Sequence, residues 1–282
     1  MDWLTDNKLP LGKLIKVAVD WLNTNAAWLF DAVSSSLGFV IDGLIDAMQW
    51  FPPLALVVLF VGLSFWLHRS WKLSAFVAAA LLLIINLGYW EETVETLALV
   101  VFAALVCMLI GVPLGIAAAH RPWLYAGLRP ILDLMQTIPT FVYLIPTLIL
   151  FGLGVVPGLI STVIFAIPAP IRLTHLGISS VPKPLLEAGE AFGATRWQQL
   201  WKVELPHALP TIMAGLTQCI MLSLSMVVIA ALVGAGGLGK PVVRALNSVN
   251  IAQGFEAGLS IVLVAILLDR LCRRPNHSTD GS

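Results

Sequence analysis

The sequence predicts an all-α, polytopic membrane protein, and three observations support this fold class. Of the 282 residues, 59% are apolar and only 11% are charged, whereas soluble domains are about 25% charged. The mean hydropathy is +0.91. Apolar stretches of roughly 20 residues, the length that a helix needs to cross a bilayer, recur along the chain. The net charge of zero gives no indication of nucleic-acid binding.

The apolar stretches predict about six or seven membrane helices. The fourth and fifth stretches are interrupted by Pro139, Pro146, Pro168 and Pro170. Such breaks are tolerated where neighbouring helices or a cavity satisfy the freed backbone groups, so we expect these two stretches to line a pathway. The predicted spans are 50–68, 73–87, 93–120, 130–151, 156–176, 208–233 and 255–271.

Residues 1–49 form a separate N-terminal segment in which apolar stripes alternate with charged residues. Moderate length and strong amphipathicity favour helices that lie on the outer, extracytoplasmic surface. A membrane span over 26–48 is the alternative, although Asp31, Asp42 and Asp46 would be costly inside a bilayer. The stripes comprise Leu14, Ala18, Trp21 and Leu22, followed by Leu37, Val40, Ile41, Leu44, Ile45 and Met48.

Basic residues gather on one side of the predicted spans, which the positive-inside rule places in the cytoplasm. The N-terminus is then outside and the C-terminus inside, with a transmembrane domain at 50–271, a cytoplasmic loop at 177–207 and a cytoplasmic tail at 272–282. The other side carries Glu91, Glu92, Glu256 and the acidic N-terminal segment, which includes Asp2 and Asp6. The basic set is Arg69, Lys72, Arg121, Arg129, Arg172, Lys183, Arg196, Lys202, Arg270, Arg273 and Arg274.

The stretch EAGEAFGATRWQQLWKVELP, residues 187–206, is a polar, helix-patterned loop between two apolar stretches. A proline at 182 or 184 suits the first turn of a helix, and Gly193 is a natural C-terminal stop. Thr195 and Gln198 have the spacing of a capping box, so a second helix begins there. We expect this helix to end at Leu205-Pro206. The product is a helix–turn–helix that another protein can approach closely, or a solvated loop that packs on its own spans.

This loop resembles the signature of inner-membrane permeases of binding-protein-dependent ABC importers. The pattern is E-A-small, three residues, Gly, nine residues, an aliphatic residue, any residue and Leu-Pro; the one departure is Gly189 where alanine is usual. The similarity extends over roughly 86–270 through NLGYWEETVETLALV, ILDLMQTIPTFVYLIP, GVVPGLISTVIFAIPAPIR and MLSLSMVVIAALVGAGGLG, which resemble permeases of glycine betaine, proline betaine and choline importers. GVPLGIAAAHRPWLY and APIRLTHLG are similar to the choline-type branch. The matching loop residues are Glu187, Ala188, Gly189, Gly193, Val203, Leu205 and Pro206.

The resemblance implies the type I permease fold of ABC importers and a transport subunit that imports quaternary ammonium compounds such as choline or glycine betaine. It implies no catalytic residue, metal or cofactor on this chain, with ATP and Mg bound by a separate cytoplasmic ATPase that grips the 187–206 loop. The other implied partners are an extracytoplasmic substrate-binding protein, a second permease copy and membrane lipid, in the bacterial cytoplasmic (inner) membrane. The alternative is an ion-coupled secondary transporter, which would predict buried charges and an inverted repeat.

The candidate pathway residues come from the broken spans. An ionisable residue at membrane depth is a functional candidate, so Asp133 either attracts a cation or has a structural role at a helix end. A trimethylammonium group donates no strong hydrogen bond and is held by aromatic faces, although core packing is the alternative role for the aromatic residues. The candidates are Asp133, Gln136, Phe141, Tyr143 and Phe165.

The glycine-rich stretch GAGGLGKP, 234–241, approaches a phosphate-binding P-loop without completing it. The last position should be Ser or Thr to hold magnesium, and Pro241 cannot do so. An apolar span rather than a strand precedes the stretch. We therefore expect a tight outer turn that does not bind nucleotide. No histidine pair has metal-ligand spacing, and no serine or cysteine lies in a nucleophile motif.

Overall fold

The computed structural model describes residues 11–272, which fold into helices joined by short turns. The predictions that involve Asp2, Asp6, Arg273, Arg274 and the tail after Cys272 lie outside the described residues, as do the side chains of Leu14 and Ala18. In chain order the helices are α2 Leu11–Gln49, α3 Pro53–His68, α4 Trp71–Asn86, α5 Trp90–His120, α6 Pro122–Thr137, α7 Thr140–Phe151, α8 Val155–Ala166, α9 Pro168–Ser179, α10 Lys183–Ala191, α11 Arg196–Gln199, the π-helical turn η1 Leu200–Glu204, α12 Leu205–Ala230, the 3₁₀ turn η2 Ala231–Val233, α13 Gly239–Ser248 and α14 Ile251–Cys272.

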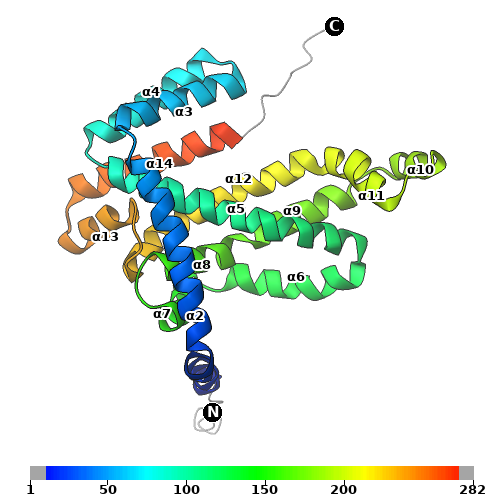
Figure 1. Ribbon diagram of the computed structural model, residues 1–282, viewed down its shortest axis with the longest axis horizontal. Helices are drawn as coiled ribbons and strands as arrows, with labels where there is room; N and C mark the ends of the chain where they lie inside the picture. Colours follow the sequence, from blue (N-terminus) through cyan, green and yellow to red (C-terminus); the bar gives the residue numbers. More distant parts are fainter. Residues whose placement is uncertain (1–10, 273–282) are drawn as a thin grey trace, which may run out of the picture.

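The helices α5, α6, α9 and α12 run alongside one another and set the long direction of the molecule (Figure 1). The short helices α10 and α11 project from one end of this bundle, and α13 lies at the other end (Figure 1). Because α12 has 26 residues and a helix rises 1.5 Å per residue, α12 is about 39 Å long, which is enough to cross a bilayer. The bundle is therefore long enough for its two ends to reach opposite sides of a membrane.

The predicted all-α membrane fold is confirmed. Within the described residues, five helices are long and apolar enough to cross a membrane, or six if the bent pair α6 and α7 counts as one span. The predicted spans 50–68 and 73–87 correspond to α3 and α4, which have 16 residues each and are shorter than the roughly 20 residues that a span needs. They pack against each other, and α4 also contacts α14. The main core joins α4, α5, α12 and α14 through buried side chains that include Leu81, Val100, Leu224 and Val264.

The fourth predicted span is sharply broken, as its prolines predict. Helices α6 and α7 meet at an angle of 96°. Ile138 ends α6 in an extended conformation, because a residue that precedes a proline is driven away from the helical region. By contrast, Ile167 keeps helical angles between α8 and α9, and Val155–Ser179 is continuous enough to form a single candidate span.

The N-terminal helix α2 crosses the bundle steeply instead of running along it (Figure 1). It has 39 residues and is kinked at Ala26. Its second half packs on α5 and α8 through the fully buried Ile41, joined by Leu37 and Ile45 from the predicted stripe, whereas Val40 is 48% exposed. By length and composition Ile15–Gln49 also qualifies as a span. The outer-surface location of this segment therefore stays a prediction.

Close contacts between small residues hold α9 against α5. Gly111 and Gly115 lie about one turn apart on the face of α5 that meets α9, the spacing with which small residues let membrane helices approach closely. A Cβ atom on Gly115 would lie 2.6 Å from the Cβ of Thr174 and 2.7 Å from the carbonyl oxygen of Ile171. This packing fixes α9 and hence the start of the segment that follows it.

Candidate functional site

The signature loop forms two short helices that meet at a glycine turn; residues 183–204 are called the elbow below. Helix α10 ends with the Ala194 N–H donating to the Gly189 carbonyl at 3.0 Å and the Gly193 N–H donating to the Glu190 carbonyl at 2.9 Å. These two bonds are those of a Schellman motif. Gly193 has a φ of +76°, a conformation that glycine adopts without a steric penalty. The predicted helix stop is therefore present.

The second helix of the elbow begins at the predicted capping box. The Gln198 N–H donates to the Thr195 hydroxyl at 3.3 Å, and the Thr195 N–H donates to Gln198 Oε1 at 2.9 Å. The amide of Gln199 then donates to the Leu186 carbonyl of α10 at 3.3 Å. Since Gln199 is buried, this bond ties the two helices of the elbow together.

The prediction that the second helix ends at Leu205-Pro206 is wrong. The chain passes from α11 through the π-helical turn Leu200–Glu204 directly into α12. The Leu205 N–H bonds to the Leu200 carbonyl, so the turn is one residue wider than an α-helical turn. Pro206 has no N–H to donate, and its ring clashes with a carbonyl four residues earlier in a regular helix. The wider turn relieves that clash, and the helix continues.

The elbow presents aromatic side chains to its surroundings. No residue of α10 is buried. Phe192 at the tip is 92% exposed, and Trp197 and Trp201 are 67% and 55% exposed, with their rings 5.6 Å apart. An apolar surface of this kind on a projecting segment is typical of a site that another protein covers.

The signature residues differ in how far they are exposed. Glu187, Ala188 and Pro206 are exposed, while Gly189 is half-buried between the two helices. A Cβ atom on Gly189 would lie 3.9 Å from both Gln199 Cδ and Val203 Cγ2. That is an ordinary packing distance, so the alanine usual in the family would fit here equally well.

The structure brings some of the predicted pathway residues together and separates others. Tyr143 of α7 and Phe165 of α8 have ring centroids 6.5 Å apart, and the Tyr143 hydroxyl donates to the Met135 carbonyl of α6, across the bend. Gln136 is half-buried on α6. Phe141 is 56% exposed and stands apart from the ring pair.

Asp133 forms an ion pair with a residue that the sequence assigned to a cytoplasmic loop. Its Oδ1 lies 2.7 Å from Nη2 of Arg172. Arg172 lies inside α9, within the predicted span 156–176. The side chains of Arg172 and Asp133 are 33% and 54% exposed, which leaves a charged pair partly uncovered on the α6 and α9 face.

At the opposite end of α12, the glycine-rich turn is held by the start of α5. The carboxylate of Glu95 accepts a hydrogen bond from the Gly237 N–H, and the Thr96 hydroxyl accepts one from the Leu238 N–H at 2.8 Å. Any Cβ on Gly237 would lie 2.6 Å from Thr96 Oγ1. The turn is therefore tight, as predicted, and two of its amides are already bonded to protein oxygens.

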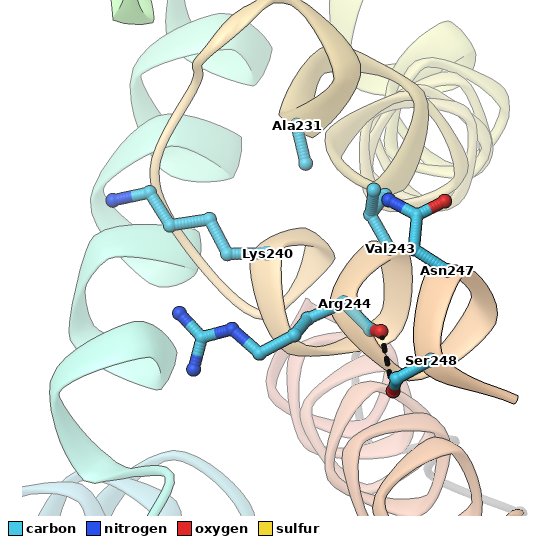
Figure 2. A pocket seen from close by; sticks show the side chains of 6 residues that line it. All are labelled: Ala231, Lys240, Val243, Arg244, Asn247 and Ser248. Atoms are coloured by element: carbon cyan, nitrogen blue, oxygen red, sulfur yellow. Dashed lines mark hydrogen bonds between the residues drawn. The ribbon is translucent and has the colours of Figure 1, made fainter. Parts of the chain in front are cut away.

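Two basic side chains of α13 extend to the same side of this turn (Figure 2). Lys240 Nζ lies 3.7 Å from Glu95 Oε2, and Arg244 follows one turn later. They line an open cavity of about 460 Å³ together with Ala231, Val243, Asn247 and Ser248. Nearby, burial raises the pKa of Tyr89, as do Glu256 and Glu92, while Arg244 opposes the shift.

With this geometry in place, the class of protein follows. Residues 111–273 match the family described as "Binding-protein-dependent transport system inner membrane component", and the chain belongs to that family. It is thus a multi-pass inner-membrane transport permease and not an enzyme, and ATP hydrolysis takes place on a separate subunit. Family membership implies an ATPase and a substrate-binding protein as partners. The chain is therefore not the ion-coupled secondary transporter that was the alternative interpretation of the sequence.

Several relatives are similar over nearly the whole chain. The glycine betaine transport system permease protein OpuAB of Bacillus subtilis is 45% identical, with 94% of this chain and 93% of the relative covered. The glycine betaine/carnitine transport permease protein GbuB of Listeria monocytogenes is 46% identical, with 95% and 96% covered. The glycine betaine/proline betaine permease ProW of Escherichia coli is 42% identical over 93% of this chain and 74% of its own length. None of these three names mentions choline.

A solved structure supports the same fold. An inward-facing form of the MetNI methionine ABC transporter matches with a TM-score of 0.56 and 26% identity, covering 64% of this chain and 93% of that one. The predicted type I ABC importer permease fold is thereby confirmed.

Proposed function

We propose that this permease imports a quaternary ammonium compound of the glycine betaine class, and that the ATPase drives import by moving the elbow. The role of the elbow in coupling to the ATPase is supported by its position and exposure. The elbow projects from one end of the bundle, no residue of α10 is buried, and Phe192 at its tip is 92% exposed. The names of the relatives support the substrate class. ATP and Mg bind to the ATPase and not to this chain.

The proposed orientation places the elbow in the cytoplasm and α13 outside. The N-terminus is outside and the C-terminus is cytoplasmic. Since the elbow and α13 lie at opposite ends of α12 (Figure 1), an ATPase and a binding protein can dock on the two ends at once. Lys240 and Arg244 on α13 would then face a binding protein with an acidic docking surface.

Two copies of the permease form the proposed pathway. The half-exposed Asp133–Arg172 pair supports this arrangement, because charged side chains within membrane helices face water or protein rather than lipid. The α6 and α9 face therefore turns toward the second copy and the pathway, while exposed apolar side chains such as Val58 and Trp66 of α3 contact lipid.

The proposed contacts of the substrate are Asp133, Gln136, Tyr143, Phe165 and Phe141. The neighbouring rings of Tyr143 and Phe165, tilted by 51° to each other, support a role for aromatic faces in holding a trimethylammonium group. Exchanging the pair, as Asp133→Arg with Arg172→Asp, tests whether the two charges act together. Uptake is expected to fall in each single variant and to recover in the exchange.

The central experiment reconstitutes the permease, the ATPase and the binding protein in vesicles. Uptake of glycine betaine is expected to require ATP, and choline supplied in its place measures the breadth of the substrate class. Phe192→Asp is expected to abolish co-purification of the ATPase and ATP-dependent uptake, because it places a charge at the tip of the apolar surface. Trp123→Ala, at an exposed tryptophan of α6, is the matched control. Uptake that follows an ion gradient without ATP would refute the proposal.

A further inference from the structure

The longest helix of the bundle core reaches the elbow without a covalent connection to it. The elbow continues from α9 at one end and into α12 at the other, whereas α5 ends at His120 beside it. Any movement of the elbow therefore passes to α9 and α12 through the backbone, but it reaches α5 only through side-chain contacts.

One ion pair makes such a contact. Nε2 of His120 lies 2.9 Å from Oε2 of Glu204, the last residue of the π-helical turn. The side chain of Glu204 is only 11% exposed, and in the described part of the chain its Oε2 atom has no hydrogen-bond partner. A buried carboxylate requires a compensating charge, so the His120 ring is what stabilises Glu204 in this position.

Both ring nitrogens of His120 have an oxygen neighbour. Nδ1 lies 3.0 Å from the Ile116 carbonyl, and a carbonyl oxygen only accepts, so Nδ1 carries a hydrogen. Nε2 faces a carboxylate oxygen, which likewise only accepts. The ring therefore lies between the Ile116 carbonyl of α5 and the Glu204 carboxylate of the π-helical turn.

The His120–Glu204 pair lies between a cluster of apolar contacts and a cavity. Apolar contacts adjoin it, where Ile116 and Ala119 of α5 pack in the same cluster as Leu200 and Leu205. Beside it the boundary between α5 and the elbow opens into a cavity of about 620 Å³. The charged residues that line this cavity are His120, Arg121, Glu190, Arg196 and Glu204. Among the described residues, the His120–Glu204 pair is the only ion pair that spans this boundary.

The π-helical turn places Glu204 at the point where the elbow meets α12. Single π turns within helices occur frequently at functional sites. Here the turn joins the elbow to α12, so a change in the angle of the elbow changes the position of the Glu204 carboxylate. Because Glu204 holds the end of α5 through His120, that change reaches α5 at the same time as α12.

We propose that His120 and Glu204 are positioning residues that connect the elbow to α5, so that α5, α9 and α12 move together when the ATPase moves the elbow. This inference rests on the proposed coupling of the elbow to an ATPase. The pair binds neither substrate nor nucleotide. It decides how much of the elbow movement becomes movement of the pathway.

The test uses the reconstituted complex and measures uptake per ATP hydrolysed. His120→Gln and Glu204→Gln are expected to keep ATPase assembly and hydrolysis while the ratio of uptake to hydrolysis falls about tenfold, within the usual range of coupling between sites. His120→Arg places a permanent cation at this position and is expected to retain much of the ratio. Glu190→Gln is the matched control, because Glu190 lines the same cavity without an ion pair among the described residues. An unchanged ratio in both single variants would overturn the proposal.

A second measurement does not depend on transport. Thermal unfolding of the two single variants and of the double variant His120→Gln/Glu204→Gln forms a double-mutant cycle. The double variant is expected to be less destabilised than the sum of the single variants, because it leaves no unpaired buried charge. Additive losses would show that the pair does not form and would overturn the inference. An interaction in the cycle combined with a normal uptake ratio would overturn the connecting role alone. Absence of ATP-dependent uptake in the wild-type complex would overturn the proposed function as well.

Discussion

Replacing Gly115 with alanine tests whether the contact between α5 and α9 is as close as the structure shows. The new methyl group would lie 2.6 Å from Thr174 Cβ and 2.7 Å from the Ile171 carbonyl oxygen, whereas ordinary contacts begin at about 3.4 Å. One of the obstructing atoms belongs to the backbone, so no side-chain rotation relieves the clash. The two helices must separate by about 1 Å.

The expected loss of stability follows from two opposing terms. Overpacking a tight contact costs about 1–3 kcal/mol, while exchanging glycine for alanine in a helix contributes about 1 kcal/mol in the other direction. The net loss of about 0–2 kcal/mol lowers the unfolding temperature by up to about 8 °C in a domain of this size. Thermal unfolding of the purified permease in lipid nanodiscs measures the shift.

The matched control is Gly127→Ala on α6, where a Cβ atom meets nothing within 4 Å. This variant is expected to keep or slightly raise the unfolding temperature, because only the helix propensity changes. If Gly115→Ala proved as stable as Gly127→Ala, the close approach of α5 and α9 would be refuted, and with it the argument that this packing positions the elbow.

Three further predictions concern the other end of the bundle and the orientation of the chain. Glu95→Gln removes the charge that holds the Gly237 N–H and faces Lys240; it is expected to destabilise the permease by about 1–3 kcal/mol in thermal unfolding, while the exposed Glu91→Gln has little effect. The double variant Lys240→Glu/Arg244→Glu is expected to reduce stimulation of the ATPase by the binding protein several-fold, whereas Lys72→Glu leaves it unchanged; equal stimulation would remove α13 from the docking surface. A reporter inserted after Gly88 is expected to be outside and one after Val181 inside, and the reverse pattern would overturn the orientation.

The elbow was predictable because its signals are local. Gly193, Thr195 and Gln198 act within a few residues of one another, through a left-handed helix end that glycine favours and a capping box formed by Thr195 and Gln198. The end of the second helix was not predictable in the same way. Pro206 is a reliable stop for an α-helix, but a π-helical turn accepts it, and nothing in the local pattern distinguishes the two.

The remaining contacts of the site depend on residues far apart in the chain. Glu95 and Gly237 are separated by 142 positions, and Asp133 and Arg172 by 39. A carboxylate near the end of a span looks the same in a sequence whether it pairs with a lysine, a guanidinium or water. The ion pairs therefore emerged only when the fold placed their helices together, and Glu95, Thr96, His120 and Glu204 were missed as a result.

The bond between Glu95 and the glycine-rich turn affects how the turn responds to dissolved anions. Exposed amides of such a turn form a nest for phosphate, sulfate or other dissolved anions. Here a carboxylate from the same chain accepts the hydrogen bond of the Gly237 N–H, so that amide is not available to an anion in solution. A variant with a smaller, neutral residue at position 95 would open the nest, and the stability of the transporter would then respond to sulfate.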